Sequence, residues 1–581
     1  MFGKSVSMLP SIPPLVVAHE LAADLAAGTR REWLECNGLG SFAMGTVAGA
    51  ATRRYHAILC VATRPPVGRM VLVNRLEETA IVDGSPYDLS TNFYPGVVHP
   101  EGYRAIVGFR LDPWPTWTIR AGGALIERTL FMPHGRQMTV VMWRLVEAAG
   151  GSGRARLFVK PMISGRDYHA LHAENDALAR DVEIAEGLVT MRPYESVPAV
   201  YLHHNGLFRA RPDWYRRFEY PVERERGLDY QEDLFTPGEL QLDLVPDFDA
   251  VAIFSVEPPG SPPGEPLRPS ELRHDERMRR GALLGNCESD FERQLRLAAD
   301  KFLVRRDEHR SVVAGYPWFT DWGRDTFIAL PGLSLATGWT ALGHELLLAW
   351  ARVVRDGLIP NRFPEAGEPE YTSVDAPLWF VLAVRRFAER VDDAEAMARL
   401  LPGVRAVIDA FLDGTRLGIG VDDDGLVHAA APSLSRTWMD ARVGDWCVTP
   451  RGGKPVEIQA LWVAALEAVA HLFAGDDADY ARELGDRAAW ARSSFAASFW
   501  DEEHGWLYDV VDGKTRDATL RPNQLYALGL TTPLVDAARA VRVLSVCERE
   551  LVTPVGVRTR ARGDGYRGRL AGDQRARDAA Y

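Results

Sequence analysis

Residues 257–269 have the sequence EPPGSPPGEPLRP, and this stretch separates two parts of the chain with different periodicities. Its six prolines and two glycines interrupt both helices and strands, because proline lacks an amide donor and glycine favours turns. We therefore predict a proline-rich linker and lead-in over residues 257–287. This division places one domain at residues 1–256 and a second domain at residues 288–581.

The part that precedes the linker has the alternation of β-strands. Residues 239–244, with the sequence ELQLDL, alternate polar and apolar side chains, as a strand with one buried face does. Residues 70–73 and 139–146 are short runs rich in β-branched side chains between turn residues. Several such runs, separated by glycine and aspartate turns, predict an antiparallel, β-sandwich-like domain.

The part that follows the linker has the period of α-helices. Apolar side chains recur every three or four residues in four segments, which predicts amphipathic helices there. Over the whole part beyond residue 288 we count about ten helices. The four stripes are Phe291, Leu295, Ala298 and Phe302; Phe380, Val384, Phe387 and Val391; Ile458, Leu461, Trp462, Ala465 and Val469; and Tyr480, Leu484, Ala488, Ala491 and Phe495.

Long polar loops rich in aromatic residues join several of these helices. The most prominent cover residues 312–324, 357–376 and 414–456. Long loops in a compact helical domain are usually functional, so we expect these loops to be functional as well.

The composition is that of an acidic globular protein. The chain has 581 residues, of which 46% are hydrophobic and 25% charged, and its formal net charge is −12. Because an acidic protein repels phosphate backbones, we expect no nucleic-acid partner. The five cysteines are odd in number, widely scattered and without metal-ligand spacing, so they favour neither a disulfide framework nor a metal site.

The N-terminal residues do not have the pattern of a secretory signal. Lys4 is followed by an apolar stretch that Pro10, Pro13 and Pro14 interrupt, and Glu20 follows closely. No apolar run approaches the ~20 residues that a membrane span needs. We therefore expect a soluble, cytoplasmic protein with no membrane partner.

Tryptophans beside carboxylates recur in the helical part. Eleven of the sixteen tryptophans follow residue 288, and Trp322, Trp438 and Trp446 each stand close to an aspartate. An aromatic ring can stack on the apolar face of a sugar, and glycoside hydrolysis needs two carboxyl groups across the bond. The same residues also suit an apolar core with carboxylates that cap helices. Their recurrence in successive loops leaves these two interpretations evenly balanced.

Three other patterns do not support a function. Residues 38–43 match a dinucleotide-binding fingerprint, but a poor helix follows and no acidic residue stands near position 60. His203 and His204 are adjacent, so on a strand they point to opposite faces and make poor metal partners. No nucleophile-elbow pattern of a serine hydrolase is present.

Several motifs occur in order over nearly the whole chain. In the N-terminal half they are residues 32–40 (EWLECNGLG), 52–56 (TRRYH) and 164–169 (SGRDYH). In the C-terminal half they are residues 315–330 (GYPWFTDWGRDTFIAL), 437–440 (TWMD), 453–462 (GKPVEIQALW) and 520–524 (LRPNQ). Together these motifs resemble those of the glycogen debranching enzyme family in its bacterial and archaeal form.

The resemblance implies a β-sandwich-like N-terminal domain and a C-terminal (α/α)6 toroid. It also implies amylo-α-1,6-glucosidase activity, which removes single α-1,6-linked glucose residues from a branched α-glucan such as glycogen or limit dextrin. The route is inverting and needs no cofactor or metal. In that family the aspartate of the TWMD motif is the proton donor, which is Asp440 here. By the same analogy Trp322 stacks on the terminal glucose, while Arg324 and Asp325 bind its hydroxyl groups.

Three further residues are candidates for substrate binding. Trp438 and Glu457 would line the same pocket, and Asp375 is a weaker candidate that suits a helix N-cap equally well. A general acid must be protonated near neutral pH, so Asp440 needs a raised pKa, which the apolar Trp438 beside it can supply by desolvation. Asp325, paired with Arg324, is expected to stay ionised.

Sequences of this family continue beyond the point equivalent to Tyr581, and the general base is expected there. A toroid closes with twelve helices, so we expect an incomplete toroid, with a short variant that has a rearranged end as the alternative. Two other functions stay open: another (α/α)6 glycosidase of the glucoamylase or trehalase kind, and a glucan-binding protein without turnover. The sequence does not indicate an oligomeric state.

Overall fold

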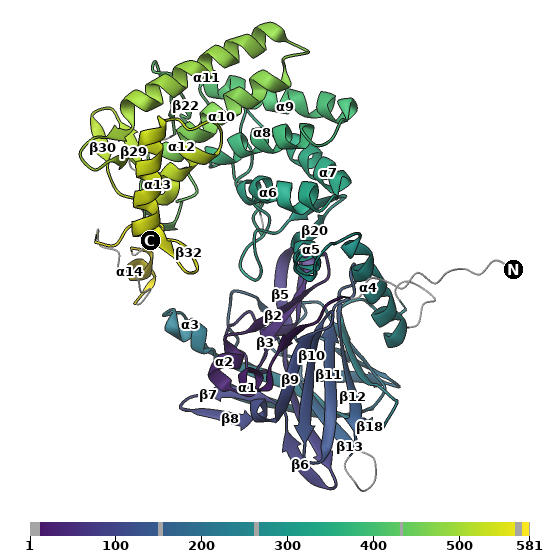
Figure 1. Ribbon diagram of the computed structural model, residues 1–581. Coiled ribbons are helices and arrows are strands. Elements are labelled where there is room, and N and C mark those ends of the chain that lie inside the picture. Colours follow the sequence, from purple (N-terminus) through teal and green to yellow (C-terminus); the bar gives the residue numbers. More distant parts are fainter. Residues whose placement is uncertain are drawn as a thin grey trace, which may run out of the picture. The chain divides into compact units, whose positions relative to one another are not determined.

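The computed structural model describes residues 12–148, 155–260, 267–365, 367–429, 431, 434–563 and 572–579 (Figure 1). It divides into two compact units, residues 1–308 and 309–581. The boundary lies in the turn between β20 (Leu303–Arg306) and β21 (His309–Val312). Residues 261–266 of the predicted linker lie outside the described residues.

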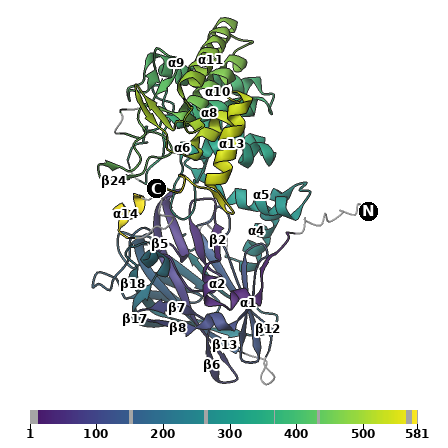
Figure 2. The same cartoon turned by 60° about the vertical axis from the view of Figure 1, so that its left-hand side comes forward.

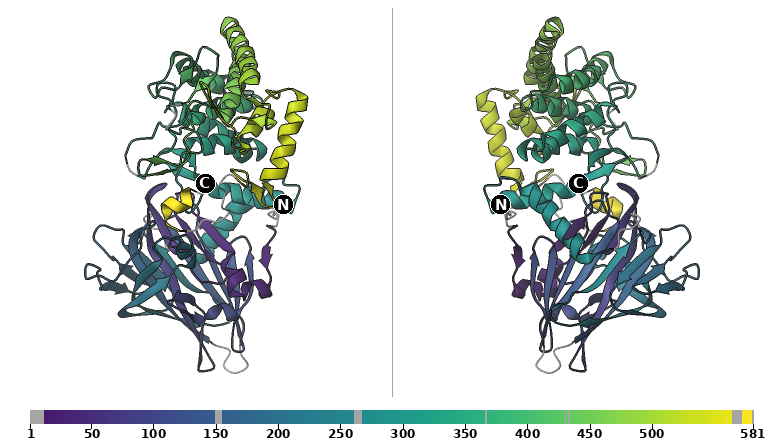
Figure 3. Two further views of the ribbon diagram at one scale, coloured as in Figure 1. Left: turned by 90° about the vertical axis from the view of Figure 1, so that its left-hand side faces the viewer. Right: turned by 90° about the vertical axis from the view of Figure 1, so that its right-hand side faces the viewer.

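Two antiparallel sheets make up most of the first unit (Figure 3). Within the described residues, the larger sheet has nine strands in the order β1 (Leu15–Val17), β9 (Ile106–Leu111), β10 (Pro115–Ala121), β11 (Ala124–Phe131), β12 (Met138–Glu147), β19 (Ala250–Ser255), β16 (Val200–His204), β15 (Leu188–Met191) and β14 (Val182–Ala185). The second sheet has the order β17 (Leu207–Glu219), β18 (Gln231–Leu244), β13 (Ala155–Asp167), β5 (Val67–Val82), β4 (Ala57–Arg64), β3 (Phe42–Thr46) and β2 (Glu32–Cys36), and β6 (Ser85–Asp88) pairs with β5. Smaller elements are α1 (His19–Ala22), α2 (Leu25–Thr29), β7 (Thr91–Tyr94), β8 (Val97–Glu101) and α3 (Pro221–Glu225).

The core of the first unit lies between the two sheets. Ile126 and Trp143 of the larger sheet and Leu72 and Leu157 of the second belong to one buried apolar cluster. The alternation predicted from the sequence is present in β18, where Leu240, Leu242 and Leu244 are buried. Residues 70–73 lie in β5 and residues 139–146 in β12. The predicted antiparallel, sheet-rich N-terminal part is therefore confirmed.

A buried carboxylate joins the two sheets. Glu78 of β5 accepts hydrogen bonds from Nε1 of Trp143 at 2.8 Å and from Nη1 of Arg128 at 2.6 Å. The Glu78 side chain is only 1% exposed. The guanidinium of Arg128 also lies 4.1 Å from the centre of the Trp117 ring. Since a buried charge is tolerated only when it is paired and hydrogen-bonded, this contact specifies how the sheets face each other.

Replacing Glu78 by alanine tests this contact. The change leaves Arg128 without its anion inside the sandwich, so the free energy of unfolding should fall by about 3–5 kcal/mol. Urea-induced unfolding followed by tryptophan fluorescence measures the difference. Replacing the exposed Glu101, which pairs with Arg104 at the surface, should leave the unfolding midpoint close to wild type. Equal midpoints for the two variants would contradict the bridging role of Glu78.

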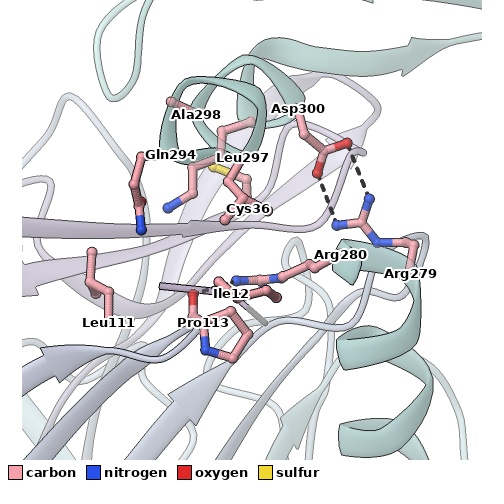
Figure 4. A pocket seen from close by; sticks show the side chains of 11 residues that line it. Ile12, Cys36, Leu111, Pro113, Arg279, Arg280, Gln294, Leu297, Ala298 and Asp300 are labelled. Atoms are coloured by element: carbon pink, nitrogen blue, oxygen red, sulfur yellow. Dashed lines mark hydrogen bonds and ion pairs between the residues drawn. The ribbon is translucent and has the colours of Figure 1, made fainter. Parts of the chain in front are cut away.

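Two helices that follow the linker are fixed to the sandwich by ion pairs. Arg280 of α4 (Pro269–Leu284) is buried and donates from Nη2 to Oε2 of Glu35 on β2 at 2.5 Å. Arg279 donates two hydrogen bonds, of 3.1 and 2.9 Å, to Asp300 of α5 (Asp290–Phe302), beside a cavity of about 160 Å³ (Figure 4). Both helices therefore belong to the first unit.

The compact units and the domains predicted from the sequence divide the chain at different residues. The sequence pattern put residues 257–287 in a linker and lead-in and began the helical domain at residue 288, whereas the compact units divide after residue 308. The predicted stripe on α5 does form a helix, but it is not buried, because Phe291 is 74% exposed and Leu295 52% exposed. The charged face of α5 makes the contacts instead.

The second unit is helical (Figure 2). Its described helices are α6 (Gly323–Leu330), α7 (Thr340–Ala351), α8 (Asp375–Ala388), α9 (Ala394–Asp413), α10 (Val456–Leu472), α11 (Ala478–Ser498), α12 (Tyr526–Gly529), α13 (Ala537–Leu551) and α14 (Gln574–Asp578). With α5, the described residues beyond 288 hold ten α-helices, as the sequence predicted. α6 continues as a π-helical stretch over Pro331–Ala336, where proline removes an α-helical hydrogen bond.

The predicted apolar stripes form the core of the second unit. Phe380, Val384 and Phe387 are buried on α8, which ends before Val391. The stripe from Ile458 to Val469 is buried throughout on α10, and α10 contacts both α8 and α11. The predicted helical C-terminal part is therefore confirmed. In the part of the chain that the structure describes, no helix is both long and apolar enough to cross a membrane.

Short hairpins occupy the long connections of the second unit. They consist of β22 (Gly420–Val421) with β23 (Val427–His428), β24 (Arg442–Val443) with β25 (Trp446–Cys447), β26 (Lys454–Pro455) with β29 (Val510–Asp512) and β30 (Thr515–Asp517), β27 (Trp500–Asp501) with β28 (Trp506–Leu507), and β31 (Val552–Thr553) with β32 (Gly556–Val557). Outside these short strands, the long connections between the helices are irregular, as predicted for the loops.

Candidate active site

The three long loops of the second unit meet at one cavity of about 350 Å³. The amide of Gly323 donates to the carbonyl of Asn361 at 3.0 Å, which joins the first loop to the second. The amide of Val374 donates to the carbonyl of Arg436 at 2.9 Å, which joins the second to the third. All the lining residues come from these loops: Trp322, Asn361, Arg362, Glu370, Thr372, Leu434, Ser435, Arg436, Asp440 and Arg442.

The Trp-Gly-Arg-Asp segment brings Trp322 to this cavity. Gly323 begins α6, and a Cβ atom there would lie 2.5 Å from the carbonyl oxygen of Pro360, so only glycine allows the second loop to approach. The guanidinium of Arg362 lies 5.6 Å from the centre of the Trp322 ring. Arg362 also donates two hydrogen bonds of 2.8 Å to Glu370. The indole is thus held at the cavity by the neighbouring loop.

Arg324 connects two of the predicted carboxylates. It donates from Nε to Oδ2 of Asp375 at 2.5 Å and from Nη2 to Oδ1 at 3.0 Å. Its Nη2 also lies 3.6 Å from Oδ2 of Asp440. Asp375 and Arg324 are both buried, whereas the Asp440 side chain is 35% exposed and lines the cavity. The structure therefore brings Arg324, Asp375 and Asp440 together.

Burial raises the pKa of the Asp440 carboxyl. The positive charge of Arg324 opposes this shift, the negative charge of Asp375 adds to it, and a hydrogen bond from the side chain of Asn361 also lowers the pKa. The direction is the one that the sequence analysis required of a general acid. Desolvation is the leading cause, as expected, and Asp375 contributes a second cause that the sequence did not indicate.

Asp325 and Asp375 each differ in one respect from what the sequence predicts. Asp325 was expected to pair with Arg324 and stay ionised, but Asp375 forms the two hydrogen bonds to Arg324. Burial raises the pKa of Asp325, and Arg324 only partly opposes this. Asp375 does not cap α8 either, because the residue before the helix is Val374 and Ser373 Oγ accepts from the amide of Ala376.

A second arginine organises the loop that carries Asp440. Arg451 is fully buried and forms an ion pair with Glu457, at 2.6 Å between Nη2 and Oε2. It also donates to both carboxylate oxygens of Asp509, at 2.8 and 2.9 Å, and to Oγ1 of Thr437 at 3.1 Å. Burial raises the pKa of Glu457, and the charge of Arg451 opposes that shift. We call Arg451, Glu457, Asp509 and Thr437 the Arg451 cluster.

Trp438 is attached to the Arg451 cluster. Its Nε1 donates to Oδ1 of Asn523 at 3.0 Å, and the amide of Asn523 donates to Oδ1 of Asp509 at 2.8 Å. This contact joins the LRPNQ segment to the TWMD segment. Trp438 and Glu457 thus make contacts that support the loop. Among the predicted site residues, Trp322 and Asp440 line the cavity.

Replacing Arg451 by methionine should make stability more dependent on pH. Without Arg451 the pKa of Glu457 rises further above its ordinary value of 4.5. A carboxyl group whose pKa is raised by folding stabilises the protein at low pH, and this stability is lost as the pH rises through the folded-state pKa. The variant should therefore lose more stability than wild type between pH 5 and pH 8, besides an overall loss of about 3–5 kcal/mol.

Thermal unfolding midpoints at the two pH values measure this effect. Arg487→Met, which removes an exposed arginine paired with Glu483 on α11, is the control and should behave like wild type. The same difference between pH 5 and pH 8 in both variants would argue against a buried, charge-neutralised Glu457.

Sequence reasoning missed part of the cavity lining. Asn361, Arg362, Glu370, Arg436 and Arg442 belong to no motif that the residue pattern singled out. The available signal was the length of the loops at residues 357–376 and 414–456, which marked the segments but not the side chains. Single charged residues in a loop have no periodicity that shows which of them face a cavity.

Comparisons with known proteins indicate the family of the chain. A family model described as "Amylo-alpha-1,6-glucosidase" matches residues 297–581, and one described as "Glycogen debranching enzyme N terminal" matches residues 31–250. A glycogen debranching enzyme of Saccharomyces cerevisiae is 26% identical, over 43% of this chain and 22% of the yeast protein. The match spans about a fifth of the length of that relative.

The fold is similar to that of a solved glycosidase. A bacterial glucoamylase, determined in complex with acarbose, superimposes with a TM-score of 0.54 at 13% identity. The match covers 90% of this chain and 80% of the glucoamylase. The fold and the family models together place the chain in the class of glycoside hydrolases. Within that class it belongs to the glycogen debranching enzyme family.

Proposed function

We propose that this protein is an amylo-α-1,6-glucosidase that removes α-1,6-linked glucose residues from a branched α-glucan. The observation that carries the proposal is Asp440, a half-buried carboxyl with a raised pKa at a cavity made by three loops. The family membership supports the reaction class, and the likeness to a glucoamylase supports a fold suited to glucan ends. We further propose that the helices of the second unit form part of an (α/α)6 toroid.

Asp440 acts as the general acid in this proposal. It donates its proton to the glycosidic oxygen, while a second carboxylate takes a proton from a water molecule that attacks the anomeric carbon from the opposite face, which inverts the configuration. An inverting pair of carboxyl groups stands ~6.5–9.5 Å apart to admit that water. Among the described residues, Asp375 is held by Arg324 and Glu457 by Arg451, so we assign neither of them the role of base.

The other residues of the site bind the terminal glucose. Trp322 offers a ring at the cavity on which the sugar can stack, and Asp325 and Arg324 are the proposed partners of its hydroxyl groups. Asp375 orients Arg324 through two hydrogen bonds. The same pairing draws positive charge away from Asp440, which helps the acid to hold its proton.

A second enzymatic function is favoured by one observation, the likeness to a glucoamylase. In that case the cavity accepts the end of an α-1,4-linked chain. Glucose release from a limit dextrin whose branches have been trimmed to single α-1,6-linked glucose residues should exceed release from maltose and trehalose if the proposal holds. Preference for maltose identifies the glucoamylase-like alternative, and tight dextrin binding without release from any substrate identifies a glucan-binding protein.

Replacing Asp440 by asparagine should lower kcat on limit dextrin by about 10²–10⁴-fold, because the isosteric amide cannot donate a proton to the leaving oxygen. Dextrin affinity should stay near that of wild type, since the shape of the cavity is kept. Steady-state release of glucose and dextrin binding measure the two quantities. Asp423→Asn, an exposed change in the same unit, is the control. Ordinary turnover in Asp440→Asn would remove Asp440 from the mechanism.

Replacing Asp375 by asparagine should move the basic limb of the kcat/KM–pH profile to lower pH. The negative charge of Asp375 raises the pKa of Asp440, and its loss also frees Arg324 to lower that pKa further. The active, protonated form of Asp440 is then lost at a lower pH. Asp325→Asn should weaken kcat/KM without this shift, as removal of a group that binds sugar does. A basic limb at the wild-type pH in Asp375→Asn contradicts the coupling.

A further inference from the structure

The cavity that holds Asp440 contains more positive than negative charge. Its lining includes three arginines, Arg362, Arg436 and Arg442, but only two carboxyl groups, Glu370 and Asp440. Arg362 is fully engaged by Glu370 through two hydrogen bonds. Asp440 is the proposed acid, and its nearest cation is Arg324. The positive charges of Arg436 and Arg442 therefore have no carboxylate in the described cavity lining to balance them.

Neither of these two arginines has an anionic partner within the described part of the chain. Arg436 makes one long hydrogen bond, from Nη1 to the carbonyl of Thr372 at 3.4 Å, and its Nε is buried without a hydrogen-bond partner there. Arg442 lies on β24 and is exposed. Burial and the charge of Arg442 both lower the pKa of Arg436. Two like charges in a partly buried place are costly unless an anion lies between them.

Another arginine-rich cavity of the protein shows the usual arrangement. Between α4 and the larger sheet, a cavity of about 440 Å³ is lined by Arg110, Arg144, Arg273 and Arg277. Each of these guanidinium groups lies within 3.8 Å of an aspartate or glutamate oxygen. The lining of that cavity also holds more arginines than carboxyl groups, but each of its arginines has an anionic partner, unlike Arg436 and Arg442 among the described residues.

We propose that Arg436 and Arg442 form a subsite for a phosphate group at the catalytic cavity. Phosphate carries up to two negative charges and presents several oxygens, which suits two guanidinium forks better than the neutral hydroxyl groups of glucose do. The phosphate is either an ester on the bound glucan or a free phosphate ion. The inference concerns the cavity of the proposed function, but phosphate binding itself does not require turnover.

Isothermal titration of the full chain with inorganic phosphate, at constant ionic strength, tests the subsite. Wild type should bind phosphate, and Arg442→Gln should bind it about tenfold more weakly, because one charge-assisted pair of hydrogen bonds is lost. Arg436→Gln should weaken binding at least as much. Arg482→Gln removes an arginine that is 70% exposed on α11 and should bind like wild type. Because Arg442 is exposed on a two-residue strand, its replacement keeps the test valid if Arg436→Gln fails to fold.

Two results overturn the subsite: no phosphate binding by wild type, or equal affinities in Arg442→Gln and Arg482→Gln. Dextrins with and without phosphate esters identify the source. Tighter binding of the phosphorylated dextrin by wild type, lost in Arg442→Gln, identifies an ester on the glucan, whereas phosphate binding without such a preference identifies the free ion. Phosphate binding without glucose release leaves the subsite standing and rejects the proposed function. Glucose release without phosphate binding rejects the subsite alone.

Discussion

The buried ion pairs of Arg451 are the interaction on which the rest of the site depends. One guanidinium pairs with Glu457 at the start of α10 and with Asp509 before β29, and it also holds Thr437, three residues before Asp440. Carboxylates in such a place would be strongly destabilising without this cation. The Arg451 cluster therefore ties a helix, a strand and the loop that carries Asp440 to one point, and the hydrogen bonds from Val374 to Arg436 and from Trp438 to Asn523 hold the same loop.

Arg324 plays the complementary role nearer the chemistry. Beside Asp440, the proposed acid, the positive charge of an arginine favours loss of the proton that this acid would have to donate. Asp375 offsets this effect in two ways. It accepts two hydrogen bonds from Arg324, and its negative charge raises the pKa of Asp440. Three residues that the sequence proposed separately, as two binding groups and one acid, act as one electrostatic unit.

Periodicity allowed the elements to be predicted, and the reasons are visible in the structure. The strand at residues 239–244 alternates because one face packs in the sandwich, and the stripe on α10 is buried along its whole length. The stripe on α5 has the same period but is exposed, since period reports the shape of a helix and not what covers it. The compact units divide after residue 308, with α4 and α5 in the first unit, where Arg280 and Lys301 pair with Glu35 of the sandwich.

The ion pairs within the site could not be predicted from the sequence, for a different reason. Arg324 and Asp375 are 51 positions apart, and Arg451 and Asp509 are 58 apart. Any of several nearby carboxylates suits a cation equally well until folding decides the distances. Asp325 is adjacent to Arg324 in the chain and was the natural choice, but neighbouring residues at the start of a helix point in different directions.

The backbone hydrogen bonds that join the three loops influence how the site can change. Gly323 to Asn361 and Val374 to Arg436 are backbone hydrogen bonds, so they do not depend on the side chains that line the cavity, although Gly323 itself and the Arg451 cluster are still needed. The lining can therefore change without loss of these hydrogen bonds. Side chains such as Thr372 or Ser435 can be exchanged to suit a differently shaped sugar while the frame stays assembled. A fold built this way can shift its preference among glucans by small steps, each of which leaves a working cavity.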